Sequence, residues 1–251
     1  MSDFAAYPSL RSRSVLVSGG ATGIGEAMVE AFVLQGARVS FLDIQDDAAH
    51  ALVERLGSTV TYHRCDVTDV AALRSAVNDV IKMHGTVDVL VNNAANDTRQ
   101  RIEDITPEMW DAGMQVNLRH QFFLSQAVLP AMKQQQRGSI INLSSISWMI
   151  PSTGLPTYVT AKAAIVGLTR TLAHEVGEDN IRVNAVLPGA ILTERQKRLW
   201  MTPEYTAEVM SRQALKRHLY AEDVARTVLF LASDDSSAIT NQSIVVDGGW
   251  V

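Results

Sequence analysis

From Ser14 onward, short apolar runs alternate with longer amphipathic segments, and this alternation restricts the fold more than any other feature. Apolar runs of about four to eight residues are typical of buried strands, whereas apolar residues at helical spacing are typical of helices. This order is that of βαβ units, whose strands run parallel. The chain therefore predicts an α/β fold around one parallel sheet. The expected strands cover residues 14–17, 38–42, 60–63, 87–92, 139–143, 182–186 and 243–246.

Helical segments are expected in most gaps between these strands. The longest covers residues 111–133, with Phe123 and Met132 among its apolar positions, and Pro130 should bend it or start a new turn. With 251 residues, 47% of them hydrophobic, the chain can bury one large core. Since no linker divides it, residues 1–251 are expected to form a single domain.

The composition excludes several classes of function. A net charge of −5 and the lack of any basic run argue against binding to nucleic acid or to an anionic membrane. Cys65 is the only cysteine, and the first residues lack the charged and apolar regions of a secretory signal, so we expect a cytoplasmic protein. No apolar stretch approaches the roughly 18 residues of a membrane helix. The six histidines lack ligand spacing, so no metal site is expected.

A glycine-rich turn, Ser18-Gly-Gly-Ala-Thr-Gly-Ile-Gly25, directly follows the first expected strand and opens a helical segment. Glycines let the backbone approach a pyrophosphate, and a helix N-terminus supplies amide donors and a partial positive charge. Such a turn alone is a weak signal, so the strand before it and the helix after it carry the argument. Together they predict a dinucleotide site. Its candidate residues are Gly19, Thr22, Gly23, Ile24 and Gly25.

Asp43 ends the second expected strand, eighteen residues after Gly25. A carboxylate there can accept hydrogen bonds from the adenosine ribose, and it would repel a 2′-phosphate by roughly 1 to 4 kcal/mol. Because the glycine-rich turn also lacks Lys and Arg, we expect NAD rather than NADP as cofactor. The alternative role for Asp43 is that of a cap for a helix over residues 46–56.

Four further residues follow the third and fourth strands, where the adenine and its ribose would pass. They are Asp66, Val67, Asn93 and Ala94. Asp and Asn are also favoured in turns because they form local hydrogen bonds, so a purely structural role is the alternative for these residues.

Tyr158 and Lys162 are spaced to share one face of a helix, and Ser145 follows the apolar run 140–143. An ammonium beside a phenol favours the phenolate. Lowering the phenol pKa from about 10 to about 7 takes roughly 4 kcal/mol, which a unit charge about 4 Å away supplies at an effective dielectric near 20, aided by a cationic nicotinamide. These three residues predict an oxidoreductase that moves a proton and a hydride together. The alternative is a surface contact between a tyrosine and a lysine.

Residues 189–220 interrupt the alternation of strands and helices. The segment contains Pro203, several basic residues, and Trp200, Met201 and Met210. A long irregular insertion after a strand is often an active-site lid, which is our expectation here. A solvated helical excursion is the alternative.

The order and spacing of these motifs resemble those of the short-chain dehydrogenase/reductase family over about residues 12–250. The residues that carry the resemblance are Gly19, Gly23, Gly25, Asn92-Asn93-Ala94, Asn117, Ser145, Tyr158, Lys162 and Pro188-Gly189. It implies a Rossmann-type doubly wound fold with a seven-stranded parallel sheet, helices on both faces, and usually a homotetramer. Two mild departures are Ser18 in place of Thr and Ala95 in place of Gly.

The resemblance also implies residue roles. Tyr158 would be the catalytic acid/base, Lys162 would lower its pKa and bind the nicotinamide ribose, Ser145 would orient the substrate oxygen, and Asn117 would support a water relay. The remaining implied cofactor contacts are Tyr158, Pro188, Gly189, Ile191 and Thr193, the last at the nicotinamide amide.

Closer similarity is to bacterial sugar dehydrogenases of this family, which act on D-xylose, L-arabinose, L-fucose or galactose. The residues that carry it are Tyr7-Pro-Ser-Leu10, Asn96-Asp97, Asn117-Leu-Arg-His120, Ser145-Ile-Ser-Trp148, Arg195-Gln196 and the segment 229–236. A polyol needs several polar side chains near the hydride position, and an aromatic ring suits a pyranose face. The loops at the strand ends offer Asp97 and the candidate substrate residues Asn96, Ser145, Ser147, Trp148, Tyr158, Arg195 and Gln196.

The expected reaction is oxidation of the C1 hydroxyl of an aldose to an aldonolactone, with Tyr158 as general base and NAD as hydride acceptor. One alternative is a 3-oxoacyl or secondary-alcohol dehydrogenase, which an apolar lid with Trp200, Met201 and Met210 would favour. Another is a catalytically silent NAD(H)-binding protein, which would have no need of an acidic phenol.

Overall fold

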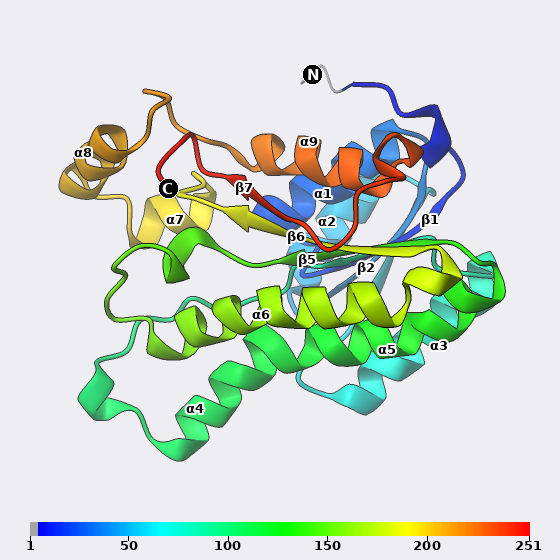
Figure 1. Cartoon of the computed structure of the whole chain (residues 1–251), viewed down its shortest axis with the longest axis horizontal. Coiled ribbons are helices and arrows are strands. Elements are labelled where there is room, and N and C mark those ends of the chain that lie inside the picture. The colour runs from blue at the N-terminus through cyan, green and yellow to red at the C-terminus, as the bar shows by residue number, and fades with distance from the viewer. Residues whose placement is uncertain (1–4) are drawn as a thin grey trace.

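The computed structural model describes residues 5–251, and a sheet of seven parallel strands forms its centre (Figure 1). The strands are β1 (Ser14–Ser18), β2 (Arg38–Asp43), β3 (Val60–Arg64), β4 (Val89–Asn92), β5 (Gly138–Leu143), β6 (Ile181–Pro188) and β7 (Ser243–Val246). Their order is β3-β2-β1-β4-β5-β6-β7, so the chain changes winding direction between β1 and β4. All seven predicted strands are confirmed, each end within two residues of its expected position.

Helices cover both faces of the sheet, as Figure 1 shows. They are α1 (Gly23–Leu34), α2 (Asp46–Leu56), α3 (Val70–His84), α4 (Pro107–Met114), α5 (His120–Gln134), α6 (Pro156–Glu175), α7 (Glu194–Leu199), α8 (Pro203–Arg212) and α9 (Ala221–Ala232). Of these, α1, α2 and α9 lie on one face, and α3, α5 and α6 on the other. The α/β, doubly wound fold class is therefore confirmed.

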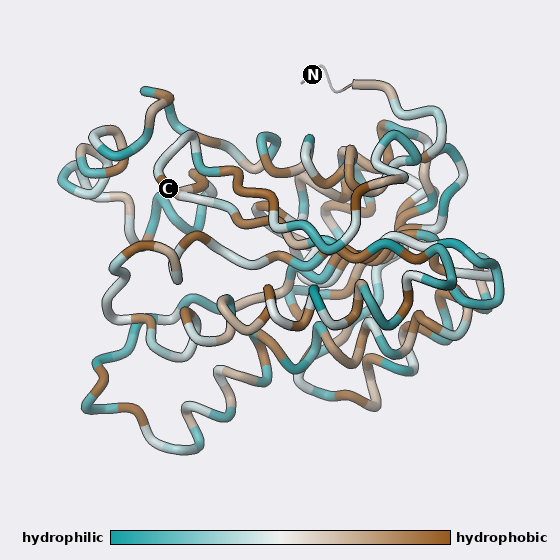
Figure 2. The backbone as a smooth tube through the Cα atoms, viewed as in Figure 1, coloured by the Kyte–Doolittle hydropathy of each residue, from teal (hydrophilic) through white to brown (hydrophobic). Residues whose placement is uncertain are grey.

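Two apolar clusters hold the helices to the sheet. In one, Met28 and Phe32 of α1 pack with Val228 of α9; in the other, Leu73 of α3 packs with Leu124 of α5, and all five are fully buried. Each such side chain contributes about 1.5 to 3 kcal/mol when it is removed from water. Figure 2 shows hydrophobic residues concentrated along the strands. The strand ends, and the loops that follow them, are thus fixed by packed cores on both faces of the sheet.

The long helix predicted over residues 111–133 is longer and less regular than expected. Helical structure runs from Pro107 to Gln134, but a π-helical turn, Gln115–Arg119, separates α4 from α5. Pro130 lies inside α5. Turns of π-helix occur frequently at functional sites, and this one carries Asn117.

The segment 189–220 was expected to be irregular, and this was wrong, because it forms α7 and α8. Thr193 and Thr202 cap the two helices by accepting hydrogen bonds from Gln196 N and Tyr205 N. Its local structure is therefore that of the helical alternative. Within residues 5–251, no helix is both long and apolar enough to span a membrane.

Candidate active site

The glycine-rich turn lies between β1 and α1, where the winding of the sheet reverses. Its backbone disfavours a side chain at three glycines. Gly19 and Gly23 have positive φ angles of 67° and 61°. A Cβ atom on Gly25 would lie 1.8 Å from the Gly19 carbonyl oxygen. Since only glycine fits there, the turn leaves its amides and the α1 N-terminus open to an anionic group. The turn therefore fits the pyrophosphate of a dinucleotide.

Ser18 and Asn93 fasten the glycine-rich turn to the end of β4. The Ser18 hydroxyl accepts hydrogen bonds from Asn93 N at 3.0 Å and Ala94 N at 3.1 Å. The Asn93 side-chain amide donates to the carbonyls of Ser18 at 3.1 Å and Gly19 at 2.8 Å. The hydroxyl, which serine and threonine have in common, is thus the group of Ser18 that accepts these hydrogen bonds. The chain at Ala95 is outside the left-handed region, so alanine there is unstrained.

Asp43 is buried at the carboxyl end of β2, beside the turn. Its Oδ2 accepts a hydrogen bond from Ala21 N at 2.9 Å, and its Oδ1 accepts from Ile44 N at 2.8 Å. The cap position of α2 belongs to Gln45, so the alternative role as a helix cap is wrong. Arg64, which lies opposite Asp43 in the strand register, pairs with Asp46 at 2.9 Å. The Asp43 carboxylate is therefore fixed, and its neighbouring arginine is occupied.

Asp66 and Val67 lie just beyond β3 rather than at its last residues, because the strand ends at Arg64. Asp66 is exposed, and its Oδ1 accepts hydrogen bonds from the Thr68 amide and hydroxyl, both at 2.8 Å. Val67 is buried. The Asp66 side chain thus closes a turn at the carboxyl edge of the sheet.

The residues after β6 return the chain to the glycine-rich turn. A Cβ on Gly23 would lie 3.5 Å from Thr193 Cγ2, so Thr193 borders the turn. A Cβ on Gly189 would lie 2.7 Å from the Asp247 Cβ, which explains the glycine after Pro188. Ile191 is buried and forms a bridge with Leu219. These contacts bring Thr193 to the predicted cofactor side.

Ser145, Tyr158 and Lys162 come together as the sequence predicts. Ser145 follows β5, and Tyr158 and Lys162 lie on α6. Ser145 acts on the Tyr158 phenol, whose pKa it lowers through a side-chain hydrogen bond. The Lys162 Nζ lies 5.4 Å from the centroid of the Tyr158 ring and donates to the Leu143 carbonyl at 2.7 Å. Lys162 is only 2% exposed, so its charge is held out of water next to the phenol.

The electrostatics of this trio differ from the expectation of an acidic phenol. Burial, and after it the charge of Asp97, raise the pKa of Tyr158 to about 12, and only the Ser145 hydrogen bond lowers it. Burial also lowers the pKa of Lys162 to about 7, against the opposing effect of Asp97. Burial therefore outweighs the groups that favour the phenolate. The attraction between an ammonium and a phenolate lowers a phenol pKa, but the cost of removing both charges from water is larger here.

Asn117 holds the loop that follows β4. This buried side chain accepts a hydrogen bond from Asn96 N at 2.9 Å and donates to the carbonyls of Asn96 and Gly113, both at 3.0 Å. The Asn96 side chain closes its own turn by accepting from Thr98 N at 3.1 Å. Asn96 was predicted to bind substrate, yet its side chain is engaged within the loop.

Asp97 connects this loop to α7. Its Oδ1 accepts hydrogen bonds from Arg195 Nε at 3.1 Å and Arg195 Nη2 at 2.8 Å, and its Oδ2 accepts from Gln196 Nε2 at 2.9 Å. The Arg99 guanidinium stacks 4.3 Å from the ring centroid of Trp200. Arg195 and Gln196, both predicted to bind substrate, are therefore committed to Asp97. No residue pattern predicts this pairing, because 98 residues separate Asp97 from Arg195.

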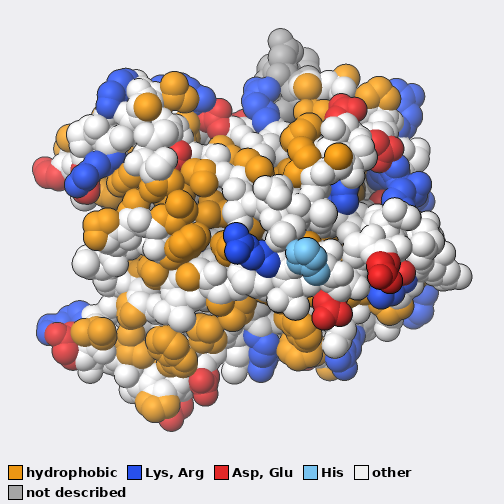
Figure 3. All heavy atoms as spheres, in the orientation of Figure 1, with side chains coloured by type: hydrophobic (Ala, Val, Ile, Leu, Met, Phe, Trp, Pro, Cys, Tyr) orange, Lys and Arg blue, Asp and Glu red, His pale blue; other side chains and the backbone are white. Residues whose placement is uncertain are grey.

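Ser147 and Trp148 lie in a short helix, Ile146–Trp148, that Ser145 caps through a hydrogen bond from Ser147 N at 3.1 Å. The Ser147 hydroxyl is buried and, within residues 5–251, has no hydrogen-bond partner. Trp148 is exposed. On the face drawn in Figure 3, hydrophobic side chains gather at the left, between α8 and α4. Of the predicted substrate residues, Ser147 and Trp148 thus keep groups that no other side chain uses.

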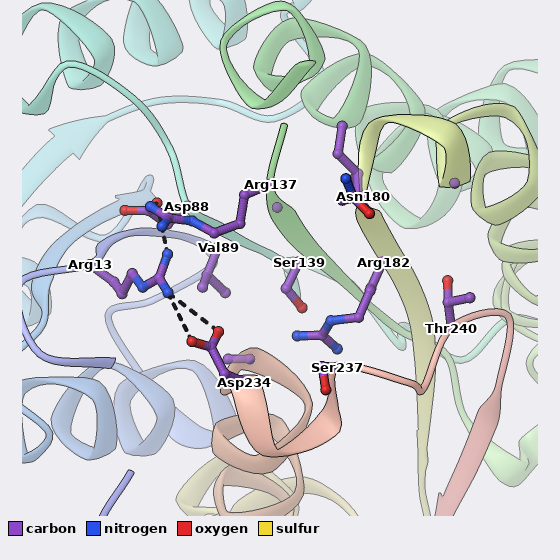
Figure 4. Close-up of a pocket in the computed structure, with 14 residues that line it drawn as sticks. Arg13, Asp88, Val89, Arg137, Ser139, Asn180, Arg182, Asp234, Ser237 and Thr240 are labelled. Atoms are coloured by element: carbon purple, nitrogen blue, oxygen red, sulfur yellow. Dashed lines mark hydrogen bonds and ion pairs between the residues drawn. The ribbon is translucent and has the colours of Figure 1, made fainter. Parts of the chain in front are cut away.

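The amino-terminal edge of the sheet holds a different cluster of charges, around a cavity of about 310 Å³ (Figure 4). Asp88 pairs with Arg13 at 3.4 Å and with Arg137 at 2.7 Å. Arg182 donates to the Ser236 hydroxyl at 2.9 Å and the Ser233 carbonyl at 3.1 Å. Arg182, and Arg13 through Asp234 at 3.3 Å, thus tie the starts of the strands to the segment after α9. None of the predicted catalytic residues lines this cavity.

The histidines do not form a metal site in the described part of the chain, where no group of three or more His, Cys, Asp and Glu side chains is arranged to hold an ion. His120, at the start of α5, is completely buried. Burial and the charge of Lys162 lower its pKa to about 3. It is therefore a neutral neighbour of Lys162.

Comparison with known proteins gives a consistent result. Residues 19–251 match the family model described as enoyl-(acyl carrier protein) reductase. The chain is 51% identical over 247 residues to a probable galactose dehydrogenase, GalD, of Rhizobium meliloti, covering 97% of this chain and 96% of that one. It is 46% identical to the D-xylose 1-dehydrogenase of Caulobacter vibrioides, covering 98% of each chain. It is 39% identical to the 3-oxoacyl-[acyl-carrier-protein] reductase FabG of Thermotoga maritima, covering 96% and 99%.

Proposed function

This chain belongs to the short-chain dehydrogenase/reductase family, and we propose that it is an NAD-dependent dehydrogenase that oxidises the C1 hydroxyl of an aldose to an aldonolactone. The observation that carries the reaction type is the grouping of Ser145, Tyr158 and Lys162 at the same edge of the sheet as the glycine-rich turn, with Lys162 Nζ 5.4 Å from the centroid of the Tyr158 ring. The similarity to two sugar dehydrogenases over nearly the whole chain supports the choice of an aldose.

Each residue of the trio has a task that its geometry supports. Ser145 donates or accepts a hydrogen bond at the reacting oxygen and so positions it next to Tyr158. Tyr158, as phenolate, removes the hydroxyl proton as the hydride leaves C1. Lys162, held by the Leu143 carbonyl, stabilises the phenolate by its charge. Because burial raises the pKa of Tyr158, oxidation should accelerate as the pH rises.

The cofactor candidates lie at the carboxyl edge of the sheet. The glycine-rich turn would hold the pyrophosphate, Asp43 the adenosine ribose, and Lys162 and Thr193 the nicotinamide half. When bound, the cofactor supplies the acceptor for the hydride. The preference for NAD rests on the fixed carboxylate of Asp43 and on Arg64, which faces Asp43 but is paired with Asp46. A 2′-phosphate at this point would meet a negative charge without a basic partner.

The α7–α8 segment acts as a lid over this site. The contacts of Asp97 with Arg195 and Gln196, and of Arg99 with Trp200, join it to the loop after β4. This segment follows β6 and therefore stands at the same edge as Tyr158. Opening it would require breaking these side-chain contacts, which suits a hinged cover.

A homotetramer is the proposed assembly. A shallow apolar hollow of about 360 Å³ lies where α5 and α6 meet the π-helical turn, and Met114, Leu118, Phe122, Phe123, Ala164 and Leu168 line it. Phe122 is 40% exposed. A contiguous apolar surface of this kind favours association with another copy of the chain. Light scattering on the purified protein tests this, with a mass four times that of the chain as the expected result.

The experiment that tests the function is reduction of NAD by the purified protein in the presence of an aldose panel. D-xylose, L-arabinose, L-fucose and D-galactose would be compared with secondary alcohols and a 3-hydroxyacyl thioester, and NAD with NADP. We expect rapid turnover with aldoses only and a higher kcat/KM for NAD. Activity confined to acyl or alcohol substrates would overturn the assignment of an aldose, and a higher kcat/KM for NADP would overturn that of the cofactor.

A further inference from the structure

Asp97 is the acidic residue whose charge acts on both members of the catalytic pair. It raises the pKa of Tyr158 and opposes the lowering of the pKa of Lys162 by burial. Its side chain is 21% exposed, so it lies at the surface of the site rather than in the core. Asp97 lies in the loop after β4, at the same edge of the sheet as Tyr158.

The carboxylate of Asp97 retains capacity for another hydrogen bond. An ionised carboxylate has about four acceptor positions. Arg195 occupies two of them on Oδ1, at 3.1 and 2.8 Å, and Gln196 occupies one on Oδ2, at 2.9 Å. Within residues 5–251, no further donor reaches Oδ2, so this oxygen can accept a hydrogen bond from a bound hydroxyl.

The position of Asp97 is fixed from two sides. Asn117 grips both backbone groups of the preceding residue, Asn96, at 2.9 and 3.0 Å. From the other side, Arg195 and Gln196 hold the carboxylate itself. A hydrogen-bond acceptor that is already oriented costs less entropy to use when a ligand arrives.

We propose that Asp97 is a specificity-determining residue that accepts a hydrogen bond from a substrate hydroxyl other than the one that is oxidised. Arg195 and Gln196 are positioning residues that act through Asp97 by fixing its carboxylate. The inference rests on the proposed function and names the group by which this site recognises a polyol. A substrate without that second hydroxyl leaves a desolvated carboxylate oxygen unpaired, which is how a polar site rejects an analogue.

The first test compares Asp97→Asn with Asp104→Asn in the full-length protein. Asp104 is exposed and contacts Arg101 at 3.9 Å, so it is a matched control away from the site. Asp97→Asn should raise the KM for the best aldose about 10- to 100-fold, which is the usual loss when a hydrogen bond to a charged group disappears. Its kcat should change less than about threefold, and its affinity for NADH should equal that of the wild type.

The second test identifies the hydroxyl through 2-, 3- and 4-deoxy analogues of the best aldose. The wild-type enzyme should lose about 10- to 100-fold in kcat/KM with one of these analogues. Asp97→Asn should not distinguish that analogue from the parent sugar, while it distinguishes the others as the wild type does. This cycle separates a direct contact from a general disturbance of the site.

The third test is the pH profile of kcat/KM, because a purely structural role of Asp97 would leave this profile unchanged. Since the charge of Asp97 raises the pKa of Tyr158, Asp97→Asn should shift the rise of kcat/KM to lower pH, and Asp104→Asn should leave it in place. If Asp97→Asn does not fold, Arg195→Met tests the same idea, with a smaller increase in KM of about 3- to 10-fold.

Three outcomes would overturn the inference. These are an unchanged KM in Asp97→Asn, equal discrimination of all deoxy analogues by the variant and the wild type, and a larger increase in KM for Arg195→Met than for Asp97→Asn. The last result would make Arg195 the direct contact. Failure of the proposed function is distinguishable, because the wild type would then fail to reduce NAD with any of the aldoses.

Discussion

The two edges of the sheet both bury charged side chains, and they treat them in opposite ways. At the amino-terminal edge, Asp88 is 5% exposed and accepts hydrogen bonds from two guanidinium groups, those of Arg13 and Arg137. At the carboxyl edge, Lys162 is 2% exposed, and the hydrogen bond of its ammonium goes to a neutral carbonyl, that of Leu143.

This difference separates charges that stabilise the fold from charges that can change their protonation state. A buried charge that is matched by opposite charges stabilises the fold only while the network is complete, and it gains little reactivity. A buried charge with a neutral partner has a strongly shifted pKa and can change its protonation state near neutral pH. The pKa of Lys162, lowered to about 7, places it in the second class. Substitutions at the two edges should therefore affect different measurements.

The largest effect is expected at the carboxyl edge, for Tyr158→Phe. Removal of the phenol oxygen leaves no group to take the proton from the C1 hydroxyl, so kcat should fall at least about 10³-fold. The stability of the fold should be retained, because the aromatic ring remains. Steady-state kinetics measure the first quantity, and urea unfolding measures the second.

NADH binding serves as the control for Tyr158→Phe, since the glycine-rich turn and Asp43 do not involve the phenol oxygen. Fluorescence titration should give the wild-type Kd within about threefold. Turnover within a factor of ten of the wild type would refute the role of Tyr158, whatever the affinity for NADH.

The next largest effect is expected at the amino-terminal edge, for Asp88→Ala. This substitution leaves Arg13 unmatched on that side and removes the acceptor of the hydrogen bond from Ser14 N. Breaking a buried pair costs about 3 to 5 kcal/mol, and the exposure of Arg137 reduces this to about 2 to 4 kcal/mol here. The free energy of unfolding in urea measures the loss.

Activity is the other half of this prediction. The kcat/KM of folded Asp88→Ala should stay within about twofold of the wild type, because this edge lies far along the strands from Tyr158. Asp235→Ala, at an exposed position nearby, should change stability by less than about 0.5 kcal/mol. A loss of activity without a loss of stability would show that the amino-terminal edge is coupled to catalysis.

The same comparison explains what the sequence could predict. The seven strands, the glycine-rich turn and the trio of Ser145, Tyr158 and Lys162 follow from local patterns, since each depends on periodicity or on residues close in the chain. The positions of the seven strands were confirmed, because a short apolar run flanked by turns has few alternatives to a buried strand. The site residues within these elements were brought together by the strand order alone.

What the sequence missed depends on distant parts of the chain. The direction of the Tyr158 pKa follows from burial, which no spacing reveals. The commitment of Arg195 to Asp97 joins α7 to the loop after β4, and 98 residues of the chain separate the two side chains. The π-helical turn at Asn117 also lacks a sequence signal, because helix propensity does not distinguish an i to i+5 bond from an i to i+4 bond.

The smallest predicted effect concerns His120, a neutral buried group beside the unmatched charge of Lys162. Its pKa is lowered to about 3 in the fold, first by burial and then by Lys162, whereas an unfolded histidine titrates near 6.5. A depressed histidine pKa favours the fold above pH 6.5, and this contribution is lost as the pH falls below that value, because the unfolded chain then binds the proton.

Between pH 7 and pH 5 this one group should remove about 2 kcal/mol from the free energy of unfolding. His120→Gln should therefore lose less stability over that interval than the wild type does, by about this amount. Other histidines with lowered pKa values, His63 and His84, are present in both proteins and cancel in the difference. Urea unfolding at the two pH values measures it. An equal loss in both proteins would mean that His120 is protonated in the fold, and the charge at the carboxyl edge would then include this histidine as well as Lys162.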